Sequence, residues 1–155
     1  MISIKPHHFV DIITSLGAGP LDLEPHPYGH AVHVVARKIT QDPGVQLKIE
    51  LGADDICRPC MHNIDSLCDD TIDTSFRPEA PESKRDWNLI IDRRWCERLN
   101  IKQNDTFSAR EFCERIKVSV ENMADIYKEE PSGRTRERQA NLQKGIDIFL
   151  DTSLQ

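Results

Sequence analysis

The sequence predicts a mainly helical α+β fold: a single domain with one short sheet and a long metal-binding loop. Three observations support this prediction. The 155 residues are enough for one hydrophobic core, so residues 1–155 are treated as a single domain. Five segments repeat apolar residues every three or four positions, as helices do, and one segment alternates apolar and polar residues, as a strand does. A long polar stretch after that strand has neither period.

The first helix is predicted in "KPHHFVDIITSLG", where Pro6 suits the first turn and Gly17 suits the end. A second helix is predicted from Pro27 to about Ile39, in "PHPYGHAVHVVARKI". Its three histidines are interpreted as ordinary residues at the border of the buried face: His26, His30 and His33.

The strand is predicted from Val45 to Leu51, because "VQLKIEL" places an apolar residue at every second position. From Gly52 to about Pro81 no period is sustained, and Asp, Asn, Ser and Pro are frequent. A loop of this length is uncommon in a compact domain unless something organises it, and a metal is the simplest organiser that these residues offer.

Three further helices complete the chain. "SKRDWNLIIDRRWCERLN" has an apolar row and a cap in Ser83 or Asp86. "FSAREFCERIKVSVENMADIYK" carries one apolar stripe, opened by a capping box of Ser108 and Glu111, and is predicted as one helix. After the break "PSGRT", a final amphipathic helix is predicted, and its arginines are interpreted as a solvated helix start: Arg134, Arg136 and Arg138.

Composition narrows the function classes. A net charge of −6 disfavours a nucleic-acid partner, which requires a positive stripe. No apolar run is long enough for a membrane span, and the N-terminal segment lacks the features of a signal peptide, so we expect a cytoplasmic protein. A protein partner is compatible with these features, but the sequence does not identify one.

The five cysteines fall into two groups. A cytoplasmic address disfavours disulfides, and an odd number cannot pair fully within one chain. Cys96 and Cys113 lie on or beside apolar helix rows and are predicted to be core residues. Cys57, Cys60 and Cys68 lie in the polar loop and require another explanation.

The three loop cysteines predict a metal centre. The Cys57-Arg58-Pro59-Cys60 spacing lets two thiolates turn toward one ion or cluster, and Cys68 follows within reach. A redox dithiol is the alternative, but no helical pattern follows Cys60 as it would in a thioredoxin-like unit. A chance clustering is the other alternative, disfavoured because exposed thiols are reactive.

Candidates for a fourth ligand come from two segments. His62 lies within the loop but only two residues beyond Cys60, which is sterically tight. His7, His8 and Asp11 share one face of the first helix, and that face could close the site. These three side chains could instead cap the start of their own helix.

The pairing of "PHHFVD" with "DDICRPCMHNIDSLCDD", followed by helical segments around "LNIKQNDTFSAREFCERI", resembles the small bacterial and archaeal family called domain of unknown function 1284. The likeness covers residues 4–116, and residues 117–155 would be a helical C-terminal extension. The resemblance implies a metal or iron–sulfur binder. The positions that match family motifs are His7, His8, Asp54, Asp55, Cys57, Cys60 and Cys68, with Asp11 where the family has a cysteine.

Two cofactors fit three thiolates and one further ligand. An iron–sulfur cluster is held mainly by thiolates and accepts another ligand at one iron. Zinc would complete a structural interaction module or, with bound water, a hydrolase in which His7, His8 or His62 transfers protons. The family pattern favours an iron–sulfur protein with an electron-transfer or sensing role, with Asp11 as the preferred fourth ligand; the sequence does not decide whether the protein is an enzyme.

Overall fold

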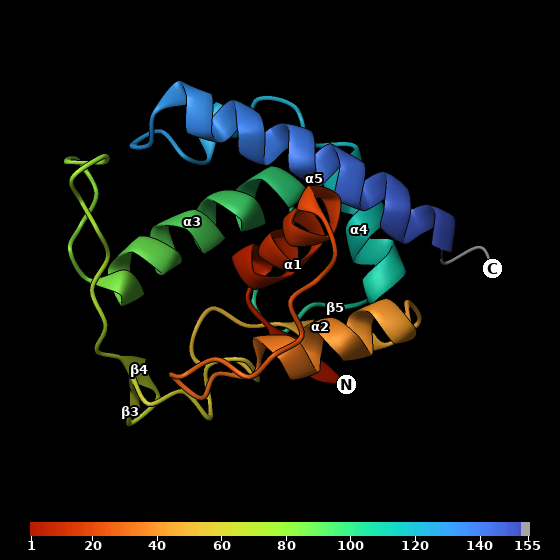
Figure 1. Cartoon of the computed structure of the whole chain (residues 1–155), viewed down its shortest axis with the longest axis horizontal. Coiled ribbons are helices and arrows are strands. Elements are labelled where there is room, and N and C mark those ends of the chain that lie inside the picture. The colour runs from red at the N-terminus through yellow and green to blue at the C-terminus, as the bar shows by residue number, and fades with distance from the viewer. Residues whose placement is uncertain (153–155) are drawn as a thin grey trace.

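The computed structural model describes residues 1–152, and its fold is built around helix α1, Pro6–Ala18 (Figure 1). Helix α1 packs most extensively against α5, Ser132–Thr152, which lies across it. The other helices are α2 (Val32–Gln41), α3 (Lys84–Leu99), α4 (Ala109–Lys117) and the short 3-10 helix η1 (Met123–Asp125). The prediction of a mainly helical α+β domain is confirmed.

A three-stranded sheet lies beneath α1. Its strands are β1 (Ile2–Ile4), β2 (Gln46–Ile49) and β5 (Thr106–Ser108), in the order β1-β2-β5. β2 runs parallel to β1 and antiparallel to β5. Leu47 and Ile49 are fully buried while their neighbours are not, so the predicted alternation is confirmed in a shorter strand.

The predicted irregular loop contains a small hairpin of two-residue strands, β3 (Asn63–Ile64) and β4 (Leu67–Cys68). The residues between the strands, Asp65 and Ser66, have φ values of 51° and 68°, as the tight turns of hairpins require. Strands this short produce no detectable period in the sequence. The hairpin is relevant to the site because it fixes the position of Cys68.

The core surrounds the buried face of α1. The ring centroid of Phe9 lies 4.9 Å from that of Phe112 on α4 and 6.3 Å from that of Phe149 on α5. Each such buried aromatic side chain contributes about 1.5–3 kcal/mol relative to exposure. Cys96 and Cys113 are buried in the same core, which confirms their predicted structural role.

Helices α1 and α5 touch backbone to backbone through two glycines. A Cβ on Gly17 would lie within 1.8 Å of the Asn141 carbonyl oxygen, and one on Gly145 within 1.8 Å of the Ile13 carbonyl oxygen. The prediction that Gly17 ends α1 is therefore wrong: the helix continues to Ala18, and Gly17 serves the close approach of α5. A local pattern could not distinguish these two uses of glycine.

The predicted helix from Ser108 to Tyr127 is also shorter than expected, because α4 ends at Lys117. Val118 is exposed, but Val120, Met123 and Tyr127 of the predicted stripe are buried. They lie in turns and in η1, and Asn122 before η1 has the left-handed conformation. The Arg98 guanidinium on α3 hydrogen bonds the carbonyl oxygens of Glu121 and Asn122, each at 3.0 Å. Side-chain bonds of this kind stabilise carbonyl groups that no longer bond within a helix.

Helix α2 begins at Val32 rather than at Pro27. The preceding residues bond to the cysteine loop instead: Met61 N donates to the Tyr28 carbonyl oxygen at 2.7 Å, and Ala31 N donates to the Ile56 carbonyl oxygen at 3.0 Å. This segment therefore forms one wall of the loop region.

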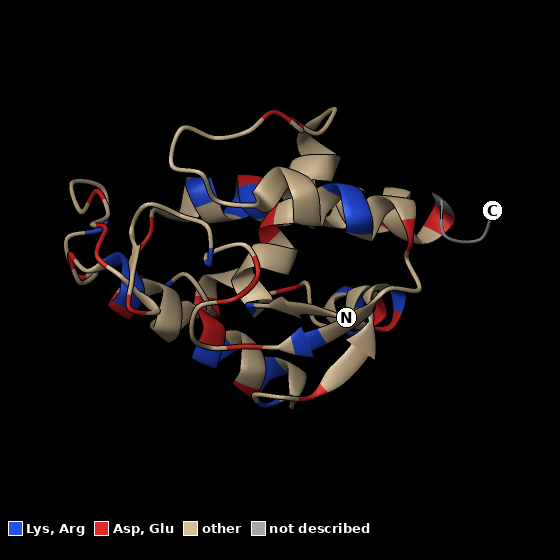
Figure 2. Cartoon of the chain, turned by 90° about the horizontal axis from the view of Figure 1, so that it is seen from below, with Lys and Arg blue, Asp and Glu red and all other residues tan. Residues whose placement is uncertain are grey.

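Acidic and basic residues are interspersed over the elements of the fold (Figure 2). Within residues 1–152, no helix combines the length and the apolar character that crossing a bilayer requires.

Candidate metal centre

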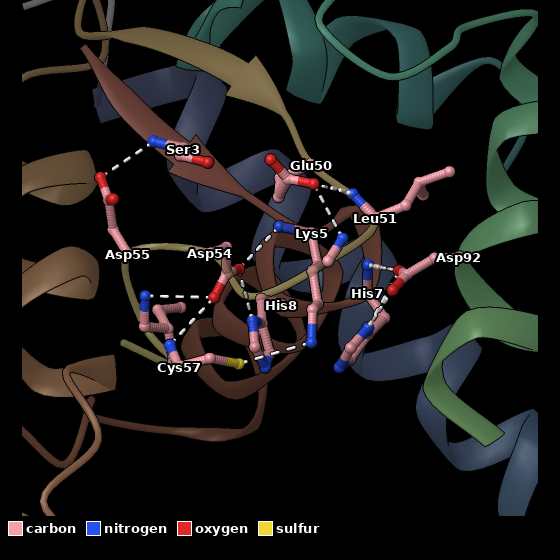
Figure 3. Close-up of polar contacts among 12 residues, drawn as sticks. Ser3, Lys5, His7, His8, Glu50, Leu51, Asp54, Asp55, Cys57 and Asp92 are labelled. Atoms are coloured by element: carbon pink, nitrogen blue, oxygen red, sulfur yellow. Dashed lines mark hydrogen bonds and ion pairs between the residues drawn. The ribbon is translucent and has the colours of Figure 1, made fainter. Parts of the chain in front are cut away.

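The N-terminus of α1 is capped by two carboxylates from distant parts of the chain (Figure 3). Lys5 N donates to Asp54 Oδ2 at 2.7 Å, and His7 N donates to Asp92 Oδ1 at 2.8 Å. Both aspartates are 0% exposed. Negative charge at a helix N-terminus is favourable, since the first N–H groups have no partner within the helix. These aspartates, rather than side chains of α1 itself, cap the helix.

The same two carboxylates hold the two histidines of α1. His8 Nδ1 lies 2.7 Å from Asp54 Oδ2, and His7 Nδ1 lies 2.9 Å from both carboxylate oxygens of Asp92. A carboxylate accepts, so the proton of each neutral imidazole belongs on Nδ1 and the lone pair on Nε2. Histidines that bind metals are commonly oriented in this way.

Asp54 also shapes the turn that carries the first loop cysteine. Its Oδ1 accepts hydrogen bonds from Ile56 N at 3.1 Å and from Cys57 N at 3.0 Å. The neighbouring Asp55 ties the loop to β1, because its Oδ2 accepts from Ser3 N at 2.9 Å. The sequence Asp-Asp before the first cysteine thus joins the loop to the beginning of the chain.

Three potential ligand groups are close enough to share one ion. Among the described residues, the metal-binding groups of His8, Asp54 and Cys57 lie within 4.8 Å of one another, and no other set of three does. Lys5 Nζ lies 3.4 Å from Cys57 Sγ on the same side of the turn. An ammonium at this distance favours the thiolate, the form that binds metals.

A cavity of about 360 Å³ joins the cysteine loop to α1. Its lining contains every ligand that the sequence predicted, which are His7, His8, Asp11, Cys57, Cys60, His62 and Cys68. Residues from two segments far apart in the sequence are therefore brought to one site.

Asp11 and His62 lie on this lining with partners of their own. His62 Nδ1 lies 2.8 Å from Asp69 Oδ1, and its ring packs edge-on against Tyr28. Asp11 is exposed and lines the cavity together with Tyr127 and Arg138. That Asp11 supplies the fourth ligand stays a prediction. Among the candidate ligands of α1, it is His8 that lies in the tight group with a loop thiol, Cys57.

The rings of His7 and His8 are adjacent, with centroids 4.3 Å apart, but their pKa values are shifted in opposite directions. Burial lowers the pKa of His8, with a further decrease from the charge of His7. Burial acts on His7 in the same direction, but Asp92 outweighs it and raises the His7 pKa. Burial and the Asp54 charge raise the pKa of Cys57 to about 11, against the opposing effect of Lys5. A bound cation would instead lower the pKa of the Cys57 thiol and favour the thiolate.

Several residues of the site were missed by sequence reasoning. Asp92 lies beside the apolar row of α3, and an acidic residue next to such a row is a detectable signal. Lys5, Arg77 and Glu130 had no local signal. Arg138 was assigned to a solvated helix start, which is wrong: its guanidinium lies 3.9 Å from the Tyr127 ring centroid and borders the cavity.

Fold and site together define a mainly helical α+β protein with a cavity lined by thiols, imidazoles and carboxylates. A family model described as protein of unknown function (DUF1284) matches residues 26–129, more than half of the chain. The chain therefore belongs to this family. No curated protein and no solved structure matches it.

The matched range contains Cys57, Cys60 and Cys68 but neither α1 nor α5. It extends beyond Ile116, the expected end of the family-like region, into the turn that follows η1. The likeness of the histidine motif in α1 to the family stays a prediction.

Proposed function

We propose that this protein binds a metal in the cavity, as an iron–sulfur cluster with an electron-transfer or sensing role. One observation carries the proposal: three loop thiols and two histidines held by carboxylates line the same cavity of about 360 Å³. When bound, such a cluster supplies one-electron redox chemistry, and it accepts thiolates together with a non-cysteine ligand.

The spacing of the thiols favours a cluster over a single ion. Two thiolates on one tetrahedral zinc lie about 3.8 Å apart, given a Zn–S bond of about 2.3 Å. Of the three loop thiols, Cys57 is the one that belongs to the tight ligand group among residues 1–152, although all three line the cavity. Thiols distributed around a cavity suit a centre with several metal atoms.

His8 is the fourth ligand that the geometry favours. Its Nδ1 is held by Asp54, which leaves Nε2 for a metal, and it already lies near Cys57. Asp11 remains the candidate that the family pattern favours.

A single zinc ion is the second candidate, supported by the tight group of His8, Asp54 and Cys57. Nitrogen, oxygen and sulfur are all ligands that zinc accepts. A zinc protein of this kind would serve as a structural module for a protein partner.

Anaerobic purification followed by analysis for iron, sulfide and zinc tests the proposal. A brown protein containing iron and sulfide supports the cluster, and a colourless protein with stoichiometric zinc supports the alternative. Ser at Cys57, Cys60 or Cys68 should lower the metal content, whereas Cys113→Ala, a cysteine in the core, should retain it. Full metal content in a variant with Ser at all three positions, Cys57, Cys60 and Cys68, would refute the site.

The fourth ligand is tested by a pair of substitutions on α1. His8→Ala should lower metal affinity more than Asp11→Ala if His8 binds the metal. The reverse order, together with tighter binding in Asp11→Cys, would assign the ligand to Asp11.

A further inference from the structure

The cavity has a second end, formed by arginines that the metal centre does not use. Four cationic side chains line the cavity against two carboxylates, Asp11 and Glu130, although the whole chain has a net charge of −6. The cations are Lys5, Arg77, Lys84 and Arg138. This local reversal of charge concentrates anions in the cavity.

Glu130 is the centre of the arginine cluster and is shared too widely to neutralise it. Its side chain is 1% exposed, and its Oε1 lies 2.9 Å from Arg77 Nη1. Its Oε2 lies 3.4 Å from Arg134 Nε and 3.3 Å from Arg138 Nη2. Three guanidinium groups thus surround one carboxylate, and with Asp11 counted as well one positive charge remains in excess.

Aromatic rings hold these guanidinium groups in place. Arg77 lies over the rings of Phe76 and Trp87, at 4.6 and 5.3 Å from their centroids, and Arg138 lies over Tyr127. Stacking on a ring orients a guanidinium without cancelling its charge. The side chains of Arg77 and Arg138 are only 12% and 19% exposed, so their positions are fixed by packing.

Arg77 keeps donors for a ligand. Among the described residues, Arg77 bonds the Asp73 carbonyl oxygen through Nε and Glu130 through Nη1. A guanidinium has five N–H donors in a planar fork that matches a carboxylate or phosphate.

We propose that the end of the cavity formed by Arg77 and Arg138 binds a small oxyanion, the carboxylate or phosphate group of a small-molecule ligand. The cavity volume is that of a small-molecule site. The inference deepens the proposed function and rests on it in one respect, that the anion would lie beside a metal. Anion binding itself requires only the arginines.

Calorimetric titration of the full chain with inorganic phosphate, and separately with malonate, tests the proposal. Arg77→Gln and Arg138→Gln should each weaken anion binding at least about tenfold, the effect of losing a charged hydrogen bond. Arg94→Gln is the matched control, because Arg94 forms a two-bond pair with Glu129 outside the cavity lining. This variant should bind like the parent. The preferred anion identifies the ligand group, and either preference supports the site.

Absence of binding with both anions, or equal affinity in the Arg77, Arg138 and Arg94 variants, would overturn the inference. If the glutamine variants do not fold, phosphate protection of Arg77 and Arg138 from phenylglyoxal in the parent chain gives the same answer by mass spectrometry. Titrations run before and after metal removal separate the two proposals: anion binding by a protein that never takes up metal would refute the metal centre alone.

Discussion

Asp54→Ala should destabilise the fold strongly, because one buried carboxylate joins the cysteine loop to the start of α1. The substitution removes the acceptor for Lys5 N and Ile56 N and the partner of His8. A buried donor left without a partner costs about 1–3 kcal/mol, and a hydrogen bond to a charged group contributes about 1.5–3 kcal/mol. We expect a loss of about 3–5 kcal/mol, a large part of the stability of a domain of this size.

Asp55→Ala is the matched control for this prediction. Asp55 is the adjacent residue, bonds Ser3 N, and pairs with the exposed Arg58 at 2.6 Å. Loss of one partly buried hydrogen bond and an exposed ion pair should cost about 1 kcal/mol. Urea denaturation of the two variants and the parent measures both values. Equal midpoints for Asp54→Ala and Asp55→Ala would refute the assignment of Asp54 as the tie between loop and helix.

The pH dependence provides a second check on Asp54. Burial alone would raise its pKa, but the charge of His8, its hydrogen bond and the bond from Lys5 N lower it well below the usual range. A lowered pKa in the folded state means that the carboxylate stabilises the fold above the unfolded pKa of about 4, and that this stabilisation is lost as the pH falls further. The difference between parent and Asp54→Ala should therefore be full at neutral pH and shrink in acid. A difference that grows in acid would contradict this sign.

Three further predictions concern packing, titration and metal removal. Gly145→Ala should lower the free energy of unfolding by about 1–3 kcal/mol or more, because its methyl group would overlap the Ile13 carbonyl oxygen. Gly133→Ala on the same helix should be neutral or stabilising in the same denaturation assay, because its methyl group would make only an ordinary contact with Arg136 Nη2 at 3.7 Å. In NMR titrations of the metal-free protein, the His7 pKa should lie above the ordinary value and the His8 pKa below it; the opposite order would contradict the pairing with Asp92. Chelation of the bound metal should lower the melting temperature, and an unchanged melting curve after verified removal would make the centre peripheral to the fold.

Features that depend on neighbouring residues could be predicted from the sequence. The capping box of Ser108 and Glu111 and the cap by Ser83 are both present, since each involves residues three positions apart. The loop cysteines were recognised because their spacing is itself a local signal. The site residues proposed from α1 reach the same cavity because a helix places positions i, i+1 and i+4 on one side.

Features that depend on tertiary contacts could not be predicted. Asp92 caps α1 across 85 positions of sequence, and Arg138 is held by a ring and a carboxylate that the helix period does not reveal. The residues around Gly17 would look the same in the sequence whether the glycine ended its helix or allowed a second helix to pack closely against it. In each case the partner lies far along the chain, and a single sequence carries no signal that connects the two.

The backbone contact between α1 and α5 determines when the site can form. Gly17 and Gly145 come from opposite ends of the described residues. The helix that carries His7 and His8 has its main packing partner in α5, more than a hundred positions further along the chain. Contacts of such large sequence separation form slowly, since closing the long loop between them costs conformational entropy. The cysteine loop precedes α5 in the chain, so its thiols are made before the histidines are held in place. Metal loading should therefore follow the docking of α5 onto α1.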